Sequence, residues 1–455
     1  RMVGSQYPKK KRVTSLYFGG GTPALVADRL KEIIDTCREY FEITENGCIV
    51  NYIETDEEMT NCHTKLTVEG SQKITMTRTG KYNTEMLRHA DRHEPSRKEI
   101  ILPTVNGYNV FKADLHTHSV FSDGSVLPKL RVEEAWRDGL DIMAVTEHIE
   151  YRPSEKTFVD YLEKYRDEKY DKAINTSLTK KAPSEEGIMV DLNYGVKETQ
   201  NAAKKYGLLV IPGSEITRNG TTVGHFNALF TTDNNLIYDP DPVQSIRNAK
   251  AQGALVMHNH PGWTRSNIDF TEAEKVAYAE GLIDGVEVMN GTEFYPGVID
   301  RVREYGQFIA ANTDIHGSTA GDYRLTGVDR PMTLIFAKEK SLEAVREALE
   351  ADRTLAYAFN TICGDEQLLK DFFVAGMRVS IIREGNDTLY ISLTNMTSVA
   401  YTICQEGHNQ KKLDPFRTIV MSVNKEIPVL SFSVLNMFCS KDAHPVVEIP
   451  LQPYM

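Results

Sequence analysis

The stretch Asp114-Leu-His-Thr-His-Ser-Val-Phe-Ser-Asp-Gly124 decides how this sequence is interpreted. His116 and His118 lie two residues apart, directly after a short apolar run. Residues i and i+2 of a strand point to the same face, so these two imidazoles can converge on one metal ion. Asp123 adds a carboxylate on the loop that follows. A pair of strand-end histidines without a metal is the alternative, and the rest of the chain has to decide between them.

Similar patterns recur further along the chain. They are Thr146-Glu-His148, Gly213-Ser-Glu215 with Gly224-His225, His258-Asn-His260-Pro-Gly262 and Asp314-Ile-His316. Seven of the twelve histidines lie between positions 116 and 316. Mixed imidazole and carboxylate ligands suit Zn, Mn or Fe, and this set exceeds the needs of one tetrahedral ion. We therefore expect two or three divalent ions, with bridging carboxylates holding neighbouring ions roughly 3.5–4 Å apart.

Size and composition indicate a globular protein of two or three domains. The chain has 455 residues, of which 41% are apolar and 25% charged. Its net charge of −12 argues against binding of nucleic acid through the backbone phosphates, because such binding requires positive charge on the protein. Nucleic acid is therefore not an expected partner. The six cysteines are scattered without a Cys-x-x-Cys pair, so neither a disulfide framework nor a zinc knuckle is indicated.

Membrane insertion is not expected, because no apolar run approaches the roughly 18 to 20 residues needed to span a bilayer. The first residues, Arg-Met-Val-Gly-Ser, contain no apolar signal core. Localisation stays open on this basis, with the cytoplasm as the default expectation and export of native relatives as the alternative.

The N-terminal residues 1–107 have a different sequence pattern from the rest of the chain. Residues 13–25 indicate a strand that runs into a glycine turn, and residues 27–41 have helical periodicity. The segment Tyr17-Phe-Gly-Gly-Gly-Thr-Pro23 resembles part of coproporphyrinogen-oxidase-like radical SAM proteins, over about residues 13–45. The three-cysteine iron–sulfur motif of such enzymes is missing, so we expect residues 1–60 to be a truncated fragment without that chemistry, or an ordinary βα unit. Residues 61–107 are expected to be a linker.

From Tyr108 to about residue 360, short apolar runs end in site-like polar residues and alternate with amphipathic segments. The expected strands are 111–115, 141–146, 208–213, 226–230, 254–257, 285–289 and 308–312. The expected helices are 130–138, 194–206, 242–252, 271–280 and 296–305. This alternation predicts an α/β fold with a parallel sheet. Polar residues at many strand ends favour a (β/α) barrel over an open sheet with one switch point, and residues 152–190 are expected to form a cap near the site mouth.

The order His-x-His, Asp, Thr-Glu-His, strand-end Glu, His-Pro-Gly and Asp-x-His resembles the PHP (polymerase and histidinol phosphatase) superfamily over about residues 108–360. The resemblance implies a distorted seven-stranded (β/α) barrel with a di- or trinuclear metal centre that hydrolyses phosphoric esters. It also implies the metal ligands. These are His116, His118, Glu215 and Asp314 around one ion, Glu215 with His225 and His260 at a second, and Asp123, His148 and His316 at a third.

Further roles follow from the same pattern. His258 competes with His260 for the ligand position, and His260 is preferred because the family ligand precedes Pro. His258 is then expected to lie behind the ligands or near the substrate and to protonate the leaving alkoxide, and Asp314 to act in catalysis as well as in metal binding. Glu147 either ligates a metal or orients a neighbouring imidazole. Arg152, Arg218 and Trp263 are candidate substrate contacts, the arginines through their planar forks; surface or packing positions are the alternative for each.

Beyond Phe373 the helical rhythm stops. Residues 378–383, 388–393, 399–403, 418–423 and 429–435 are short alternating runs separated by turns, so residues 375–455 are expected to form an antiparallel β-sandwich. Bacterial PHP phosphodiesterase-like proteins often carry such a domain. Dimerisation and control of substrate access are both open roles for it, and a homo-oligomer is therefore among the expectations.

The leading expectation is a metal-dependent phosphodiesterase that acts on small organic or nucleotide phosphodiesters through a metal-activated hydroxide. Adjacent cations lower the pKa of a bridging water and neutralise phosphoryl oxygens. A histidinol-phosphatase-like phosphomonoesterase is the nearest alternative, and it should carry more basic residues around the third metal. A nuclease is disfavoured by the net charge, and a non-catalytic scaffold would require lost ligands.

Overall fold

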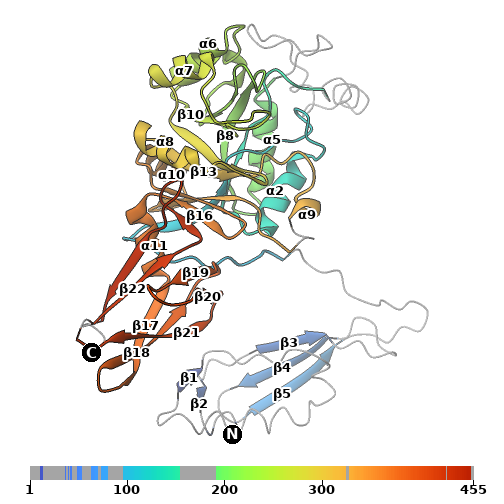
Figure 1. Ribbon diagram of the computed structural model, residues 1–455. Helices are drawn as coiled ribbons and strands as arrows, with labels where there is room; N and C mark the ends of the chain where they lie inside the picture. Colours follow the sequence, from blue (N-terminus) through green and yellow to red (C-terminus); the bar gives the residue numbers. More distant parts are fainter. Residues whose placement is uncertain are drawn as a thin grey trace. The chain divides into compact units, whose positions relative to one another are not determined.

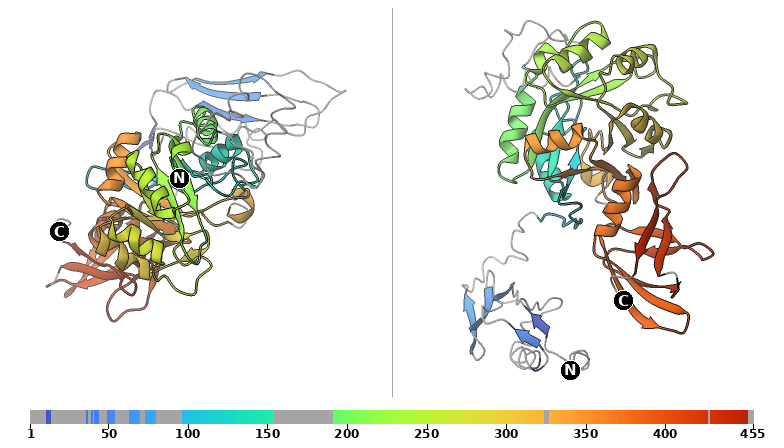
Figure 2. Two further views of the ribbon diagram at one scale, coloured as in Figure 1. Left: turned by 90° about the horizontal axis from the view of Figure 1, so that it is seen from above. Right: turned by 90° about the vertical axis from the view of Figure 1, so that its left-hand side faces the viewer.

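The computed structural model describes residues 11–13, 36, 39, 41–43, 49–53, 63–69, 73–79, 96–153, 191–323, 327–426 and 428–451. It divides into two compact units, Arg1–Pro95 and Ser96–Met455, drawn in Figures 1 and 2. The expected glycine turn at 19–21, most of the helix expected at 27–41 and the cap expected beyond Pro153 lie outside the described residues.

The first unit contains two small sheets. Strand β1 (Lys11–Val13) pairs in parallel with β2 (Phe41–Ile43). Strands β3 (Ile49–Ile53), β4 (His63–Glu69) and β5 (Lys73–Thr79) form an antiparallel sheet. Two of these strands lie inside the linker expected at 61–107, so that expectation needs correction. The short alternation of Leu66 with Val68 and Ile74 with Met76, diluted by threonines, carries too weak a period-2 signal. The radical SAM likeness stays a prediction.

A curled mixed sheet of twelve strands dominates the second unit, in the order β12-β11-β10-β9-β8-β7-β6-β14-β15-β16-β23, with β13 paired to β11. The bounds are β6 Asn109–Asp114, β7 Ile142–Val145, β8 Leu209–Thr217, β9 His225–Leu229, β10 Leu255–His258, β11 Gly285–Asn290, β12 Glu293–Phe294, β13 Phe308–Asn312, β14 Met332–Ala337, β15 Thr354–Ala358, β16 Thr361–Gly364 and β23 Met437–Phe438. All seven strands expected between 108 and 312 are present.

Helices follow most strands and pack against the sheet (Figure 2). They are α2 Pro128–Arg137, α5 Tyr194–Ala203, α6 Pro242–Ala251, α7 Glu272–Ala279, α8 Gly297–Tyr305, α9 Thr319–Asp322, α10 Leu342–Glu350 and α11 Glu366–Ala375, with a 3-10 turn at Asn234–Leu236. Local sequence sets their ends. Thr271 and Glu274 form a reciprocal capping box on α7, and Gly306 ends α8 in the left-handed conformation.

The expectation of a parallel sheet holds for part of the order only. Strand β9 runs antiparallel to both β8 and β10, and β14 runs antiparallel to β6 and β15. The connection between β8 and β9 comprises residues 218–224 alone, which is too short for the crossover that a parallel pair requires. The sheet is therefore mixed and larger than the seven-stranded barrel expected from the sequence.

Two threonine hydroxyls link β13 to strands that it does not pair with. Thr354 Oγ1 on β15 donates to Ile309 O at 2.8 Å and accepts from Ile309 N at 3.0 Å. Thr333 Oγ1 on β14 does the same for Ala311, at 3.0 and 3.1 Å. Buried backbone groups of β13 thus find partners without a β-ladder, and we call these four bonds the threonine seam.

The C-terminal strands form two antiparallel sheets. One contains β17 (Met377–Glu384), β18 (Thr388–Asn395) and β21 (Thr418–Asn424). The other contains β20 (Lys411–Leu413), β19 (Tyr401–Cys404), β22 (Val429–Val434) and β24 (Val446–Pro450). Alternate residues of β18 and β22 are buried in one hydrophobic cluster. The alternating runs are therefore strands, and their packing as a sandwich stays a prediction.

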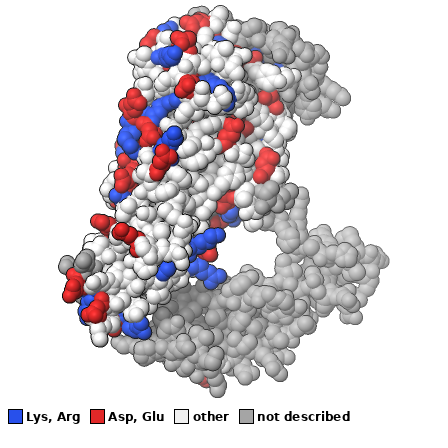
Figure 3. Space-filling model, in the orientation of Figure 1, with Lys and Arg blue, Asp and Glu red and all other residues white. Residues whose placement is uncertain are grey.

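The surface of the described residues carries charges of both signs. On the face shown in Figure 3, Lys and Arg are interspersed with Asp and Glu. Within the described part of the chain, no helix has the length and apolar character needed to cross a bilayer.

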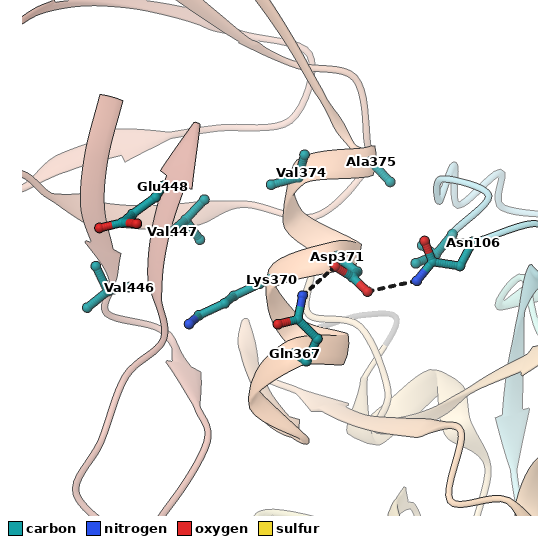
Figure 4. Close-up of a pocket in the computed structure, with 10 residues that line it drawn as sticks. Asn106, Gln367, Lys370, Asp371, Val374, Ala375, Val446, Val447 and Glu448 are labelled. Atoms are coloured by element: carbon teal, nitrogen blue, oxygen red, sulfur yellow. Dashed lines mark hydrogen bonds between the residues drawn. The ribbon is translucent and has the colours of Figure 1, made fainter. Parts of the chain in front are cut away.

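A cavity of about 590 Å³ lies between α11, β24 and the turn at Asn106 (Figure 4). Asp371 accepts hydrogen bonds from Asn106 at 2.7 Å and from Gln367 at 2.8 Å, and Val374 and Val446 add apolar surface. None of the site residues expected from the sequence lines this cavity.

The threonine seam predicts a stability effect. Thr354→Val keeps the side-chain volume but leaves the buried N–H and C=O of Ile309 without partners, so the free energy of unfolding should fall by about 1–3 kcal/mol. Urea unfolding measures this, with Thr361→Val on β16 as control, since no hydrogen bond of the Thr361 hydroxyl is found among the described residues. Equal effects of the two substitutions would contradict the role given to the seam.

Candidate metal centre

The strand ends bring the ligand-type side chains together. His116 Nε2 and His118 Nε2 lie 3.1 and 3.0 Å from the same oxygen, Asp314 Oδ1. Asp314 is placed by its left-handed backbone, with a φ of 54°, and by the bond from its N–H to His116 O. Both imidazoles are fully buried. The pair expected after β6 thus faces the carboxylate expected after β13.

A second group surrounds Asp123. His148 Nε2 lies 3.3 Å and His316 Nε2 3.1 Å from Asp123 Oδ1, and the ring of His118 stacks between the two histidines at 4.3 Å from each centroid. One ligand atom from each of these four residues lies within 4.8 Å of the others. The arrangement is of the kind that can hold a metal ion.

Glu215 lies between the groups. Its Oε1 is 3.6 Å from His116 Nε2, 3.2 Å from His225 Nδ1 and 3.8 Å from His260 Nε2. Its Oε2 is 2.6 Å from His148 Nδ1. A fully buried carboxylate that touches histidines on both sides has the position required of a bridging ligand.

Hydrogen bonds from the protein orient several imidazoles. The other ring nitrogen faces a protein acceptor in His116 (Glu287 Oε1, 2.9 Å), His118 (Ser122 Oγ, 3.3 Å), His225 (Arg218 O, 2.7 Å) and His316 (Asp314 O, 2.7 Å). When one nitrogen is protonated and bonded outward, its partner nitrogen keeps a lone pair for the cluster. We call the nine residues His116, His118, Asp123, His148, Glu215, His225, His260, Asp314 and His316 the histidine cluster.

The histidine cluster contains buried polar atoms without hydrogen-bond partners. They are His116 Nε2, His118 Nε2, Asp123 Oδ1, Glu215 Oε2 and Asp314 Oδ1. Buried polar atoms are normally satisfied, and lone pairs that converge in this way are satisfied by a cation. The residues present therefore fit divalent metal ions.

Electrostatics inside the cluster favour charged carboxylates. Burial alone would raise the pKa values of Glu215 and Asp314, but the facing histidines hold both well below the ordinary value. Burial would likewise lower the pKa of His148, whereas Glu215 and Asp123 raise it to about 10. His118 differs, because burial and the nearby His148 lower its pKa to about 3. Carboxylate ligands are thus available at neutral pH, and His148 must lose a proton to bind a metal.

Glu287 is a site residue that the sequence interpretation missed. This fully buried carboxylate on β11 lies against His116 Nδ1 and accepts from Asn312 Nδ2 at 2.9 Å, His260 N at 2.8 Å and Asn290 Nδ2 at 2.8 Å. It orients two members of the histidine cluster at once. An acidic residue inside the apolar run Val286-Glu-Val288 was the available signal.

Glu147 occupies the orienting position rather than a ligand position. Its carboxylate accepts from the Ser119 hydroxyl, from Ser119 N at 3.0 Å and from Ser122 Oγ at 2.6 Å. Ser122 in turn contacts His118. Of the two roles weighed for Glu147, the contacts therefore favour orientation of an imidazole, through a serine.

His258 lies away from the histidine cluster. Its Nδ1 is 3.0 Å from Tyr278 OH on α7, its Nε2 is 3.0 Å from Glu274 Oε1, and Phe226 stacks on the ring. The left-handed φ of 24° at His260 turns the chain, so the two histidines do not share a face as a regular strand would place them. His258 therefore contacts residues of α7 and not the histidine cluster. Its expected role as proton donor stays a prediction.

The candidate substrate residues differ in their surroundings. Arg218 pairs with Glu150 and donates to Asp239 O at 2.6 Å, so its guanidinium is already engaged by the protein. Arg152 is buried, and its contact with phosphate stays a prediction. Trp263 lies beside His225 and His260, with ring centroids 5.1 and 5.3 Å apart, and is 44% exposed.

The contacts of Glu287 predict a measurable effect on the cluster. Glu287→Gln keeps the shape but weakens the acceptor for His116 Nδ1, so metal affinity or activity should fall about 10- to 100-fold. Competition with a metal-sensitive dye measures the affinity, with Glu304→Gln on the exposed side of α8 as control. Unchanged affinity in the Glu287 variant would remove this residue from the site.

Comparisons with known proteins agree with this geometry. The model of the PHP domain family matches residues 114–318. A search of curated proteins finds no match. A crystal structure of a two-domain protein from Bacteroides vulgatus, described as containing a PHP-like metal-dependent phosphoesterase, is 32% identical, covers 79% of this chain and 99% of that chain, and has a TM-score of 0.68.

Two more distant structures match part of the chain. A candidate metal-dependent phosphoesterase from Bifidobacterium adolescentis is 17% identical over 52% of this chain and 95% of its own, with a TM-score of 0.32. Endonuclease Q bound to a DNA duplex is 15% identical over 56% of this chain and 60% of its own, with a TM-score of 0.34. Neither likeness is close enough to carry an argument about substrate. The family match and the Bacteroides relative, together with the histidine cluster, show that this chain belongs to the PHP family of metal-dependent phosphoesterases.

Proposed function

We propose that this protein is a phosphodiesterase that hydrolyses small organic or nucleotide phosphodiesters with two or three bound Zn, Mn or Fe ions. The observation that supports this is the convergence of unpartnered, buried ligand atoms from several strand ends. In a scaffold without metal, buried atoms that lack a hydrogen-bond partner would be costly, and a bound cation would satisfy them.

The proposed ligand sets follow the groups seen in the structure. His116, His118 and Asp314 surround one position, His260 and His225 share Glu215 at a second, and Asp123, His148 and His316 surround a third. Bound divalent ions would lower the pKa of a water molecule and neutralise phosphoryl oxygens. The identity of the metals and the assignment of each ligand to a particular ion are part of what we propose.

The exposed side of the histidine cluster indicates where substrate enters. The side chains of His316, Asp314 and Asp123 are 37%, 21% and 18% exposed, whereas that of Glu215 is 1% exposed. We therefore assign Asp314 to the substrate side, where its carboxylate can act in catalysis as well as in binding. Glu215 remains behind, holding the histidines around it.

The distribution of basic residues favours a diester over a monoester. A monoester dianion needs more positive charge than a diester monoanion. Near the cluster, the described arginines Arg131, Arg218 and Arg265 pair with Glu134, Glu150 and Glu274 respectively. These arginines are engaged by carboxylates of the protein, which leaves less positive charge for the substrate outside the metals. Nucleic acid as substrate is not part of the proposal, and the expectation against it gains no support from the comparisons. Assembly into a homo-oligomer stays a prediction.

Metal binding should depend on pH. Because His148 carries a proton near neutrality in the metal-free protein, binding releases it, and affinity for zinc should rise as pH rises from 6 to 8, by up to about tenfold per unit for each proton released. Calorimetry in buffers of different ionisation enthalpy counts the protons. His148→Ala should release fewer, whereas the exposed His408→Ala should not change the count. A pH-independent affinity would oppose the assignment of His148 as a ligand.

Hydrolysis of bis(para-nitrophenyl) phosphate beside the matching monoester tests the reaction. Manganese-loaded protein should turn over the diester, and His116→Ala should lower kcat/KM on the order of 100-fold or more, since it removes a ligand. His408→Ala serves as the matched control. Turnover of the monoester alone would favour a phosphatase, and bound metal without turnover of either ester would count against the proposed activity.

A further inference from the structure

We propose that the indole of Trp263 is the platform on which a planar aromatic group of the substrate stacks, so that the site takes aryl or nucleoside phosphoesters. This inference rests on the proposed function, because it names the substrate class of the same site. It extends the sequence-based role of Trp263 from a pocket wall to a determinant of specificity.

Trp263 lies at the edge of the histidine cluster. Its ring contacts those of His225 and His260, which both face Glu215. A phosphoryl group held by the metals would therefore be a few bonds away from the indole. A flat group attached to that phosphorus could then lie against Trp263.

The indole is held in place although it is exposed. The turn His260–Trp263 closes with a bond from Trp263 N to His260 O at 2.9 Å, and a side chain at Gly262 would collide with Tyr295. Gly220 packs against the ring, since a Cβ there would lie 3.0 Å from two indole carbons. Arg265 secures this contact by donating to Gly220 O at 2.7 Å.

The exposed part of the indole is open to a ligand. Trp263 is 44% exposed despite these contacts. Aromatic side chains offer a large, rigid surface, and stacking of a base on such a surface does not depend on hydrogen bonding. A solvated aliphatic ester would leave the indole uncovered, whereas a flat group would cover it. The chemistry thus favours an aryl or nucleoside substituent over glycerol-like ones.

The test uses binding instead of turnover. The chain has two tryptophans, so Trp136→Phe leaves Trp263 as the single fluorophore of the full-length protein. Trp136 lies in α2 against Tyr206, which makes this substitution the matched control as well. Adenosine monophosphate, ribose phosphate and phenyl phosphate are mixed with the zinc-loaded protein, and the emission is read by stopped flow before hydrolysis proceeds.

Adenosine monophosphate should quench Trp263, and ribose phosphate should not. Measured by calorimetry, the affinity for adenosine monophosphate should fall on the order of tenfold in Trp263→Leu and stay close to that of the parent in Trp263→Phe. The affinity for ribose phosphate should not change in either variant. If phenyl phosphate also quenches Trp263, the site accepts any flat aromatic substituent. If only adenosine monophosphate quenches it, the site is specific for nucleosides. Diester turnover without quenching would overturn this inference and leave the proposed function intact. Quenching without turnover of any ester would support stacking and overturn the proposed function.

Discussion

Desolvation of charge is the constraint on which the rest of the structure depends. Asp123, Glu215 and Asp314 lie within a cluster of six imidazoles, most of which are buried. Charges removed from water must be paired and hydrogen-bonded. The surrounding strands supply those partners. Glu287 holds His116 and the backbone of His260, Asn259 donates to Glu215, and the carbonyl of Arg218 holds His225.

Most residues of the histidine cluster could be singled out from the sequence because they stand in short local patterns at strand ends, while their role as metal ligands stays a prediction. In a pattern such as Asp-x-His, the two side chains are close in space because they are close in the sequence, so their proximity can be predicted before the fold is known. Glu287 escaped prediction because it stands alone in an apolar strand. Its partners follow β6 (His116) and β10 (His260) or lie in β13 (Asn312). His258 does not face the histidine cluster beside His260, because i and i+2 share a face only while the backbone remains extended, and His260 leaves that conformation.

For the fold too, features set by neighbouring residues could be predicted, whereas features set by distant contacts could not. Alternating strands and helices predicted an α/β sheet and located the strands between residues 108 and 312. Strand direction was beyond that pattern, because it depends on the length of each connection; the short segment 218–224 makes β9 antiparallel. The alternation beyond residue 375 predicted strands, while their division into two sheets follows from pairings such as Leu393 with Ile419 that no local pattern records.

The threonine seam joins β13 to β14 and β15 through two side chains instead of through continuous backbone pairing. In a β-ladder, every residue is paired, and a slip by one position reverses all side chains. At the seam, each hydroxyl engages the N–H and C=O of a single residue, so the backbone of β13 is tied to β15 at Ile309 and to β14 at Ala311. Beyond β13, the backbone is held by bonds to the end of β6, from Thr313 to Asp114 and from Asp314 N to His116 O. A discontinuity in backbone pairing thus leaves one strand end to follow the residues of the histidine cluster while the core around it stays packed.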